Sequence, residues 1–219
     1  MHYSPRAEIC PLPYSPFKSC TVPRPIGWLS TRSEKGIDNL APYSQWQNVS
    51  FDPPIVMFSA QRNGDGSRKD TVVNAEALGW FVWNMASYEL KEAVNISAME
   101  LGPDIDEFER ASVGKLDCLS APCARVAESP VHFECRVIKM LTFEGNSPQG
   151  TADVVFGEVE QIHIDDKFLT KDGKLDVLKI RPISRLGYYD YTSITDIFEM
   201  QIPQMEGALA SGLEGRPSR

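Results

Sequence analysis

The chain has 219 residues, of which 42% are hydrophobic and 24% are charged, and its formal net charge at pH 7 is −8. These proportions are ordinary for a soluble globular protein and exclude a chain that is disordered throughout. The acidic balance argues against a nucleic-acid-binding protein, because binding to phosphates requires a basic surface. The length fits one domain with arms better than two α/β domains.

Neither a membrane protein nor a metalloprotein is expected. The most apolar stretch, residues 78–85, is too short to cross a bilayer, and the first twenty residues lack a secretory apolar run. We therefore expect a cytoplasmic protein. Five cysteines without a CxxC pair predict reduced, structural thiols, and acidic clusters without companion histidines predict solvated loops, not metal sites.

Prolines dominate the first two dozen residues. Because proline interrupts a helix, we predict an extended N-terminal arm over residues 1–22 that lies on the body. One domain follows over residues 23–195. A C-terminal tail over residues 196–219 completes the chain, and its Gly, Ser, Pro and charge content predicts a frayed end or an arm onto a partner subunit.

The middle of the chain predicts many strands and two helices. Runs of β-branched and aromatic residues predict strands over residues 26–31, 37–41, 55–60, 79–85, 131–143, 154–164 and 183–191, with 131–164 forming a long hairpin. Apolar spacing predicts a short helix capped by Asp70 or Thr71 and a second helix over residues 87–99, with Leu90, Val94 and Met99 on its buried side. Without βαβ alternation, the fold class is an all-β barrel with helical additions.

Several short motifs follow one another along this barrel. They are RPIGWLST at 24–31, NLAPYS at 39–44, SFDPP at 50–54, KDT at 69–71 with Asn74, GEV at 157–159 with His163, and RPISRLG at 181–187. Together they resemble the flavin reductase-like family, the FMN-binding split-barrel proteins that include flavoredoxins and the reductase partners of two-component monooxygenases. The resemblance runs from about Pro23 to Tyr191.

The resemblance implies a homodimeric split β-barrel of the Greek-key type that binds FMN near the subunit interface. It also implies hydride transfer from NAD(P)H to the flavin and electron transfer onward to an acceptor such as a partner monooxygenase. The flavin accepts the hydride, so no protein nucleophile is needed, and the sequence shows none. Two alternatives stay open: a non-enzymatic FMN carrier or sensor, and a flavin-free barrel that serves as an interaction module.

The residues suit such a ligand. The FMN phosphate needs a cation and N–H donors, which Lys69 and Thr71 offer at a helix start, with Ser59 and Arg62 as helpers; the alternative is an exposed helix start with an ordinary cap. The flavin ring needs hydrogen-bond partners at its pyrimidine edge, because reduction builds negative charge there. The predicted cofactor contacts are Ser30, Thr31, Asn39, Ala41, Pro42, Tyr43, Ser44, Gln47, Ser59, Arg62, Lys69, Asp70 and Thr71.

Two further residues are candidates for contacting substrate. His163 lies in a predicted strand and could contact the flavin or the nicotinamide as the one catalytic side chain, although a lone strand histidine is more often structural. Arg185 could bind the pyrophosphate of a nicotinamide nucleotide or form a salt bridge. Among the tryptophans, Trp46 is near the predicted cofactor loop, whereas Trp80 and Trp83 flank a buried strand and predict core or interface.

Overall fold

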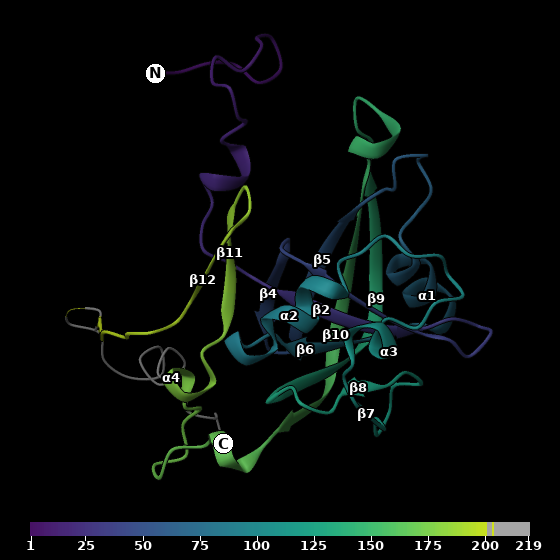
Figure 1. The fold of residues 1–219 in the computed structure, drawn as a ribbon, viewed down its shortest axis with the longest axis vertical. Coiled ribbons are helices and arrows are strands. Elements are labelled where there is room, and N and C mark those ends of the chain that lie inside the picture. The colour runs from purple at the N-terminus through teal and green to yellow at the C-terminus, as the bar shows by residue number, and fades with distance from the viewer. Residues whose placement is uncertain (201–202, 204–219) are drawn as a thin grey trace.

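The computed structural model describes residues 1–200 and 203, and its body is a seven-stranded antiparallel sheet (Figure 1). The strand order is β3-β2-β6-β9-β10-β5-β4. The strands are β2 (Gly27–Arg32), β3 (Asp38–Tyr43), β4 (Trp46–Phe51), β5 (Pro54–Gln61), β6 (Trp80–Met85), β9 (Val131–Phe143) and β10 (Ala152–Ile164). The predicted all-β class is confirmed.

The sheet curls around its core. Register shifts in the β9–β10 and β4–β5 pairs mark β-bulges, which bend strands and increase their twist. Trp46 of the edge strand β4 stacks on Trp83 of β6, with ring centroids 5.5 Å apart and an interplanar angle of 7°. Strands that are not neighbours in the sheet therefore meet inside it. The predicted hairpin over 131–164 is present, and Figure 1 shows it rising beyond the other strands.

A second sheet of three strands stands beside the body (Figure 1). It contains β1 (Arg24–Pro25), β11 (Ile183–Gly187) and β12 (Asp190–Ser193) in the order β1-β11-β12. The N-terminal arm reaches this sheet, where the Tyr14 ring meets the Tyr188 ring edge-on at 6.0 Å. The second half of the arm therefore contacts the small sheet, whereas Figure 1 shows the N-terminal end of the arm extending beyond it.

Short helices cover the sheets. They are α1 (Asp70–Leu78), α2 (Lys91–Ile96), α3 (Glu107–Ala111) and α4 (Val177–Ile180), with 3-10 turns η1 (Phe17–Ser19), η2 (Tyr88–Leu90), η3 (Pro148–Gly150) and η4 (Asp166–Phe168). Strands β7 (Lys115–Leu116) and β8 (Arg125–Val126) pair with each other as a two-stranded antiparallel ribbon. Helix α1 ends at Gly79, whose φ of +73° is a left-handed conformation that glycine adopts without strain.

Several parts of the chain differ from the sequence prediction. The helix predicted over residues 87–99 is split into η2 and α2 and ends at Ile96, so Met99 is 52% exposed instead of buried. The strand predicted over residues 183–191 breaks into β11 and β12 at Gly187 and Tyr188, which both have positive φ. Strand β4 and helix α3 were not predicted. Most of the predicted C-terminal tail lies outside the described residues.

All five cysteines are free, as predicted, and Cys123 and Cys135 are buried. Burial raises the pKa of the Cys118 thiol to about 12. Among the described residues, no helix is long and apolar enough to cross a membrane, and no group of three metal-ligating side chains is present. Cys123 and Cys135 therefore pack as small apolar side chains in the core.

Candidate functional site

A cavity of about 120 Å³ opens at the start of helix α1. Strand β3, the first turn of α1, residues 97–101 and Glu107 of α3 form its walls. Seven residues of the predicted cofactor set line it, namely Asn39, Ala41, Pro42, Tyr43, Lys69, Asp70 and Thr71. The structure thus brings together two sequence segments about thirty residues apart, as the motif order predicts.

A directional hydrogen-bond network forms one side of the cavity. The Tyr43 hydroxyl donates to Thr71 Oγ1 at 2.9 Å, and Thr71 Oγ1 donates to Asn39 Oδ1 at 2.7 Å. Thr31 Oγ1 also donates to Asn39 Oδ1, at 3.2 Å, and itself accepts from Asn74 at 3.3 Å. Because buried polar groups need partners, these bonds fix the side chains in one arrangement.

The network ends at the carboxylate of Glu107. Its Oε2 accepts from Asn39 Nδ2 at 3.1 Å and from the Leu40 amide at 3.0 Å. Burial raises the pKa of Glu107, while the Leu40 N–H partly offsets this effect. Burial likewise raises the pKa of Asp70, against the lowering effect of Lys69. Two carboxyl groups in one cavity therefore pay a desolvation cost when ionised.

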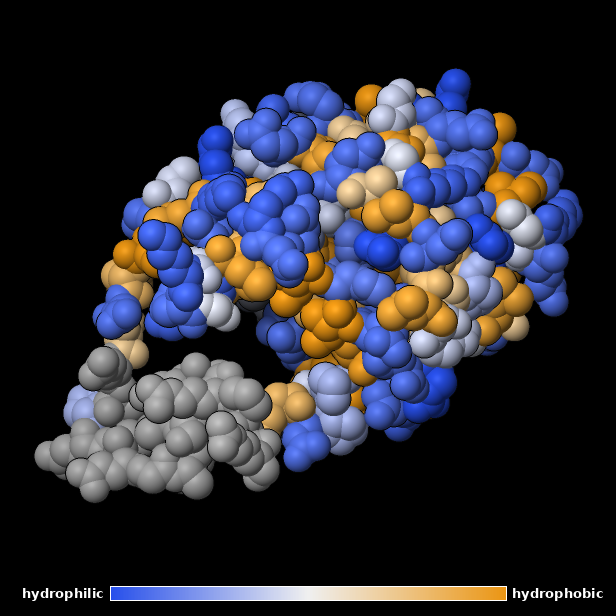
Figure 2. All heavy atoms as spheres, turned by 90° about the horizontal axis from the view of Figure 1, so that it is seen from below, coloured by the Kyte–Doolittle hydropathy of each residue, from blue (hydrophilic) through white to orange (hydrophobic). Residues whose placement is uncertain are grey.

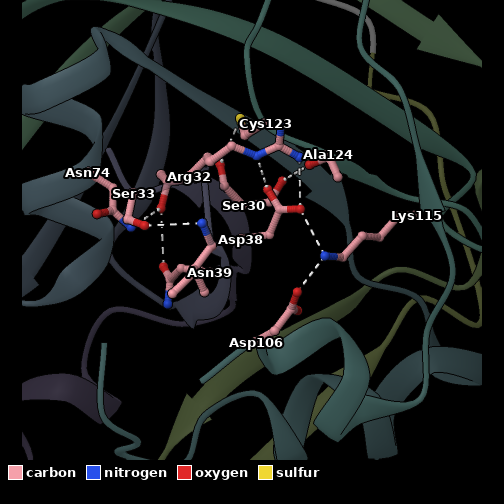
Figure 3. A network of polar contacts seen from close by, with 12 residues as sticks. Ser30, Arg32, Ser33, Asp38, Asn39, Asn74, Asp106, Lys115, Cys123 and Ala124 are labelled. Carbon is pink, nitrogen blue, oxygen red and sulfur yellow. Dashed lines mark hydrogen bonds and ion pairs between the residues drawn. The ribbon is translucent and has the colours of Figure 1, made fainter. Parts of the chain in front are cut away.

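An ion network on the other face of β3 holds these elements in place (Figure 3). Asp38, whose side chain is 3% exposed, accepts from Arg32 at 2.8 Å and 2.9 Å and from Lys115 at 2.8 Å. Lys115 also contacts Asp106, which caps α3 by accepting from the Phe108 amide. The network therefore ties the start of β3 to the helix that carries Glu107.

Cationic side chains lie at the first turn of α1. A second hollow of about 440 Å³ shares Lys69 and Glu100 with the cavity and is also lined by Arg62. Lys69 Nζ pairs with Glu100 Oε1 at 2.6 Å, and Arg62 Nε with Asp153 Oδ2 at 3.3 Å. None of the described side chains caps α1, so its first amides are available to bind an anion.

The role of the Thr71 side chain differs from the sequence prediction. The sequence predicts that this side chain contacts the phosphate, but in the structure its hydroxyl donates to Asn39 and accepts from Tyr43. Because its hydroxyl proton is already donated to Asn39, the remaining donor of Thr71 for an anion is its backbone N–H in the first turn of α1. The alternative of an exposed helix start with an ordinary cap is not realised, because no described side chain caps α1.

Six predicted cofactor residues do not line this cavity, namely Ser30, Thr31, Ser44, Gln47, Ser59 and Arg62. Ser30 is fully buried on the opposite face of β2 from Thr31, where its hydroxyl donates to the Ala124 carbonyl at 2.6 Å, because successive strand residues point to opposite faces. Gln47 is exposed on the edge strand β4, and the Ser59 amide donates to the carbonyl of Gln45. Ser44 lines a third hollow, which adjoins the cavity at Pro42 and Ala98.

His163 does not line the cavity within one chain. It lies near the end of β10, and β2, β6 and β9 separate β10 from β3 in the sheet. Its Nε2 is 2.6 Å from Glu134 Oε1. Glu134 is fully buried, and N–H donors from the 119–121 loop together with His163 hold its pKa below the usual range despite its burial. The predicted catalytic role of His163 stays a prediction.

The structure assigns two other predicted residues to specific surroundings. Trp46 lies in the core against Trp83 and is 5% exposed, so it does not line the cavity. Arg185 forms no salt bridge within the described part of the chain; its guanidinium lies 4.5 Å above the ring of Tyr191. The salt-bridge alternative for Arg185 is therefore not realised among residues 1–200.

Sequence reasoning missed Glu107 and Glu100. Glu107 lies in a helix of five residues that was not predicted. The one sequence signal for that helix is Asp106, a residue type that favours the N-cap position. Glu100 lies in an irregular segment that follows α2, and only the fold brings it to Lys69. Glu107 belongs to an acidic cluster that the sequence presents as a solvated loop, and Glu100 directly follows the helix predicted over residues 87–99.

Comparisons with known proteins identify the class of this fold and site. The chain superposes on nitrilotriacetate monooxygenase component B from Bacillus cereus with a TM-score of 0.84 and 27% identity, over 91% of this chain and 98% of that one. It superposes on an FMN-binding protein from Thermus thermophilus with a TM-score of 0.69 and 17% identity, over 91% and 100% of the two chains. The fold is the split β-barrel of the flavin reductases.

Sequence comparison then shows the family. An uncharacterised protein of Aquifex aeolicus is 38% identical over 170 residues, which are 77% of this chain and 84% of that protein. Residues 19–190 match the flavin reductase like domain. This chain belongs to the flavin reductase like family, as the motif order predicts.

Replacing the buried acid of the ion network tests how the site is held. We expect Asp38→Asn to lower the free energy of unfolding at pH 7 by about 1–2 kcal/mol, less than for a fully buried pair, because Arg32 and Lys115 are 36% exposed and become rehydrated. Urea unfolding of the variant and the wild type measures this difference.

The same substitution predicts a pH dependence. Burial alone would raise the pKa of Asp38, but Arg32 and Lys115 lower it below its usual value. The stabilisation is therefore present above the unfolded pKa of about 3.9 and is lost as the pH falls through the lower folded value. The variant and the wild type should converge in acid; an unchanged difference at pH 7 and in acid would contradict the ionic origin.

Proposed function

We propose that this chain binds FMN at the cavity beside α1 and transfers hydride from NAD(P)H to that flavin, which passes electrons on to an acceptor. The observation that carries the proposal is the uncapped start of α1, flanked by Lys69 and Arg62 and opening onto the cavity. Flavin bound there supplies a hydride acceptor, so the protein must provide binding, orientation and electrostatics.

The phosphate end of FMN fits the first turn of α1. Backbone amides at a helix N-terminus and nearby cations bind phosphate oxygens through charge-assisted hydrogen bonds. Lys69 supplies the nearest ammonium, and its present partner Glu100 is 74% exposed, so a phosphate can replace this carboxylate at little cost. Arg62 lies in the adjoining hollow.

The ring end of FMN fits the polar side of the cavity. Asn39, Tyr43 and Thr71 are held by their mutual hydrogen bonds, so they orient a ligand without rearranging. Pro42 stiffens the adjoining backbone of β3. The similarity to an FMN-binding protein of the same fold supports FMN as the flavin, and the similarity to a monooxygenase component B supports a partner monooxygenase as the acceptor.

We also propose a homodimer. Apolar side chains are exposed on the outer faces of the long hairpin and the edge strand, among them Phe51 at 89%, Phe143 at 60% and Ile162 at 57%. Figure 2 likewise shows hydrophobic side chains gathered in patches on the surface. We take these exposed apolar side chains as candidate contacts with a second copy of the chain.

Titration of the protein with FMN and with riboflavin tests the phosphate site. We expect Lys69→Met to weaken FMN binding about tenfold or more, because a charge-assisted hydrogen bond contributes roughly 1.5–3 kcal/mol. Riboflavin has no phosphate, so its affinity should stay the same. Quenching of flavin fluorescence measures both affinities. Lys171→Met, which removes an exposed charge in a turn, is the matched control. Equal losses for the two flavins would place the phosphate elsewhere.

An anaerobic absorption spectrum tests the hydride transfer. We expect NADH or NADPH to bleach the oxidised flavin band of the FMN-loaded protein, since the flavin then holds two more electrons. A protein that stays yellow with both nucleotides is a carrier or sensor, and this outcome contradicts the reductase. A colourless protein that also ignores added FMN contradicts the flavin site itself and favours an interaction module.

Sedimentation velocity of the FMN-loaded protein tests the dimer. A single species with the mass of two chains is expected, and Phe143→Lys should shift it towards one chain, because a buried unpaired charge opposes association. Lys171→Met again serves as the control. A wild-type protein that sediments as one chain would rule out the homodimer.

A further inference from the structure

A cationic hollow lies next to the cofactor cavity. It encloses about 560 Å³ between the N-terminal arm, the end of β3 and the β11–β12 hairpin, and it shares Pro42 and Ala98 with the cavity. Lys18, Arg24 and Arg185 line it, and no aspartate or glutamate does so in the described part of the chain. The protein has a net charge of −8, so a hollow lined by three cations is a positively charged site on an otherwise acidic protein.

The two arginines face each other across a strand pair. Arg24 of β1 and Arg185 of β11 are direct partners in the antiparallel register. Like charges directly opposite each other destabilise a sheet. Burial and the charge of Arg185 lower the pKa of Arg24, which is the expected sign of a cation that lacks a counter-charge. Such an arrangement is stabilised by an anion that binds between the two.

Neutral groups hold both guanidinium groups in place. Arg24 donates to the carbonyl of Thr21 at 3.0 Å and to that of Lys18, and Arg185 donates to the carbonyl of Tyr188. Neither arginine forms a salt bridge with another described residue. Carbonyls fix the orientation of the arginines but leave their charges unbalanced, so the hollow is organised for an anion before the anion arrives.

The arm that carries Lys18 and Arg24 is seated by a specific contact. Gly187 has a φ of +104°, and a Cβ atom at this position would collide with Ser19. Only glycine meets both requirements without strain. The close approach of η1 to the end of β11 therefore keeps the arm against the hairpin, and with it the position of Lys18 beside the two arginines.

We propose that this hollow binds phosphate groups of the nicotinamide nucleotide whose nicotinamide reduces the flavin next door. The inference rests on the proposed function for the identity of the nucleotide, whereas the anion site itself follows from the three cations. The phosphoryl groups come from one of two sources, the pyrophosphate that NADH and NADPH share or the 2′-phosphate that only NADPH carries. The N-terminal arm thereby becomes part of the substrate site.

Calorimetry with inorganic pyrophosphate tests the anion site without turnover. The FMN-loaded protein should bind pyrophosphate, and Lys18→Gln and Arg185→Gln should each weaken this binding about tenfold, as expected for the loss of one charge-assisted hydrogen bond. Lys18 is exposed on the arm, so its substitution does not disturb the sheet. Lys171→Gln removes the same charge from a distant turn and should change nothing. Binding that is absent, or equal in all four proteins, would overturn the proposal.

Steady-state kinetics distinguishes the two phosphate sources. An increase in KM of about tenfold for both nucleotides in the Lys18 and Arg185 variants, at unchanged kcat, assigns the pyrophosphate, whereas an increase for NADPH alone assigns the 2′-phosphate. Affinity for FMN should stay within about twofold of the wild type, since the flavin phosphate binds at α1. If FMN affinity falls as much as KM rises, the hollow belongs to the flavin and the proposal fails. If the wild type binds pyrophosphate but oxidises neither nucleotide, the proposed function has failed and the anion site stands.

Discussion

The hydrogen bonds around Asn39 are the interaction on which the site depends. Asn39 accepts from Thr31 of β2 and Thr71 of α1, and donates to Glu107 of α3. One amide thus joins three elements to its own strand β3, and these elements form the walls of the cavity. Because unpaired buried polar groups are costly, none of the elements can shift without breaking a bond that water does not replace.

The direction of these bonds has a physical origin. An ionised carboxylate only accepts hydrogen bonds, so Glu107 at the end of the network orients every proton before it. The hydroxyl of Tyr43 donates to Thr71, and Thr71 donates onward to Asn39. Ionisation of Glu107 in a desolvated place is costly, and its bonds from Asn39 and the Leu40 amide offset part of that cost. The buried carboxylate of Glu107 therefore determines which hydrogen-bond donors and acceptors of the network remain available to a ligand.

The sequence predicts most strands of the main sheet and the start of α1 because their signals are local, whereas the edge strand β4 was not predicted. Through the order of the motifs it also assigns Asn39 and Thr71 to one cofactor site. It does not predict Glu107, since the position of that residue depends on a five-residue helix and on a cap by Asp106 that Lys115 holds. The placement of Ser30 was missed for another reason: Ser30 and Thr31 are adjacent in sequence but lie on opposite faces of β2, and only the register decides which one faces α1.

Cationic and acidic side chains occupy different parts of the three adjoining hollows. Lys69 and Arg62 lie at one end, the carboxyl groups of Asp70 and Glu107 lie in the middle, and Lys18, Arg24 and Arg185 lie at the other end. Hydride transfer between two nucleotides requires both to be bound at once, and their phosphates repel each other. In the proposed function, the two cationic regions, separated by a neutral to acidic cavity, would hold two sets of phosphates apart while the reactive rings meet between them. A single cationic patch could not do both, because the first anion to bind would neutralise it.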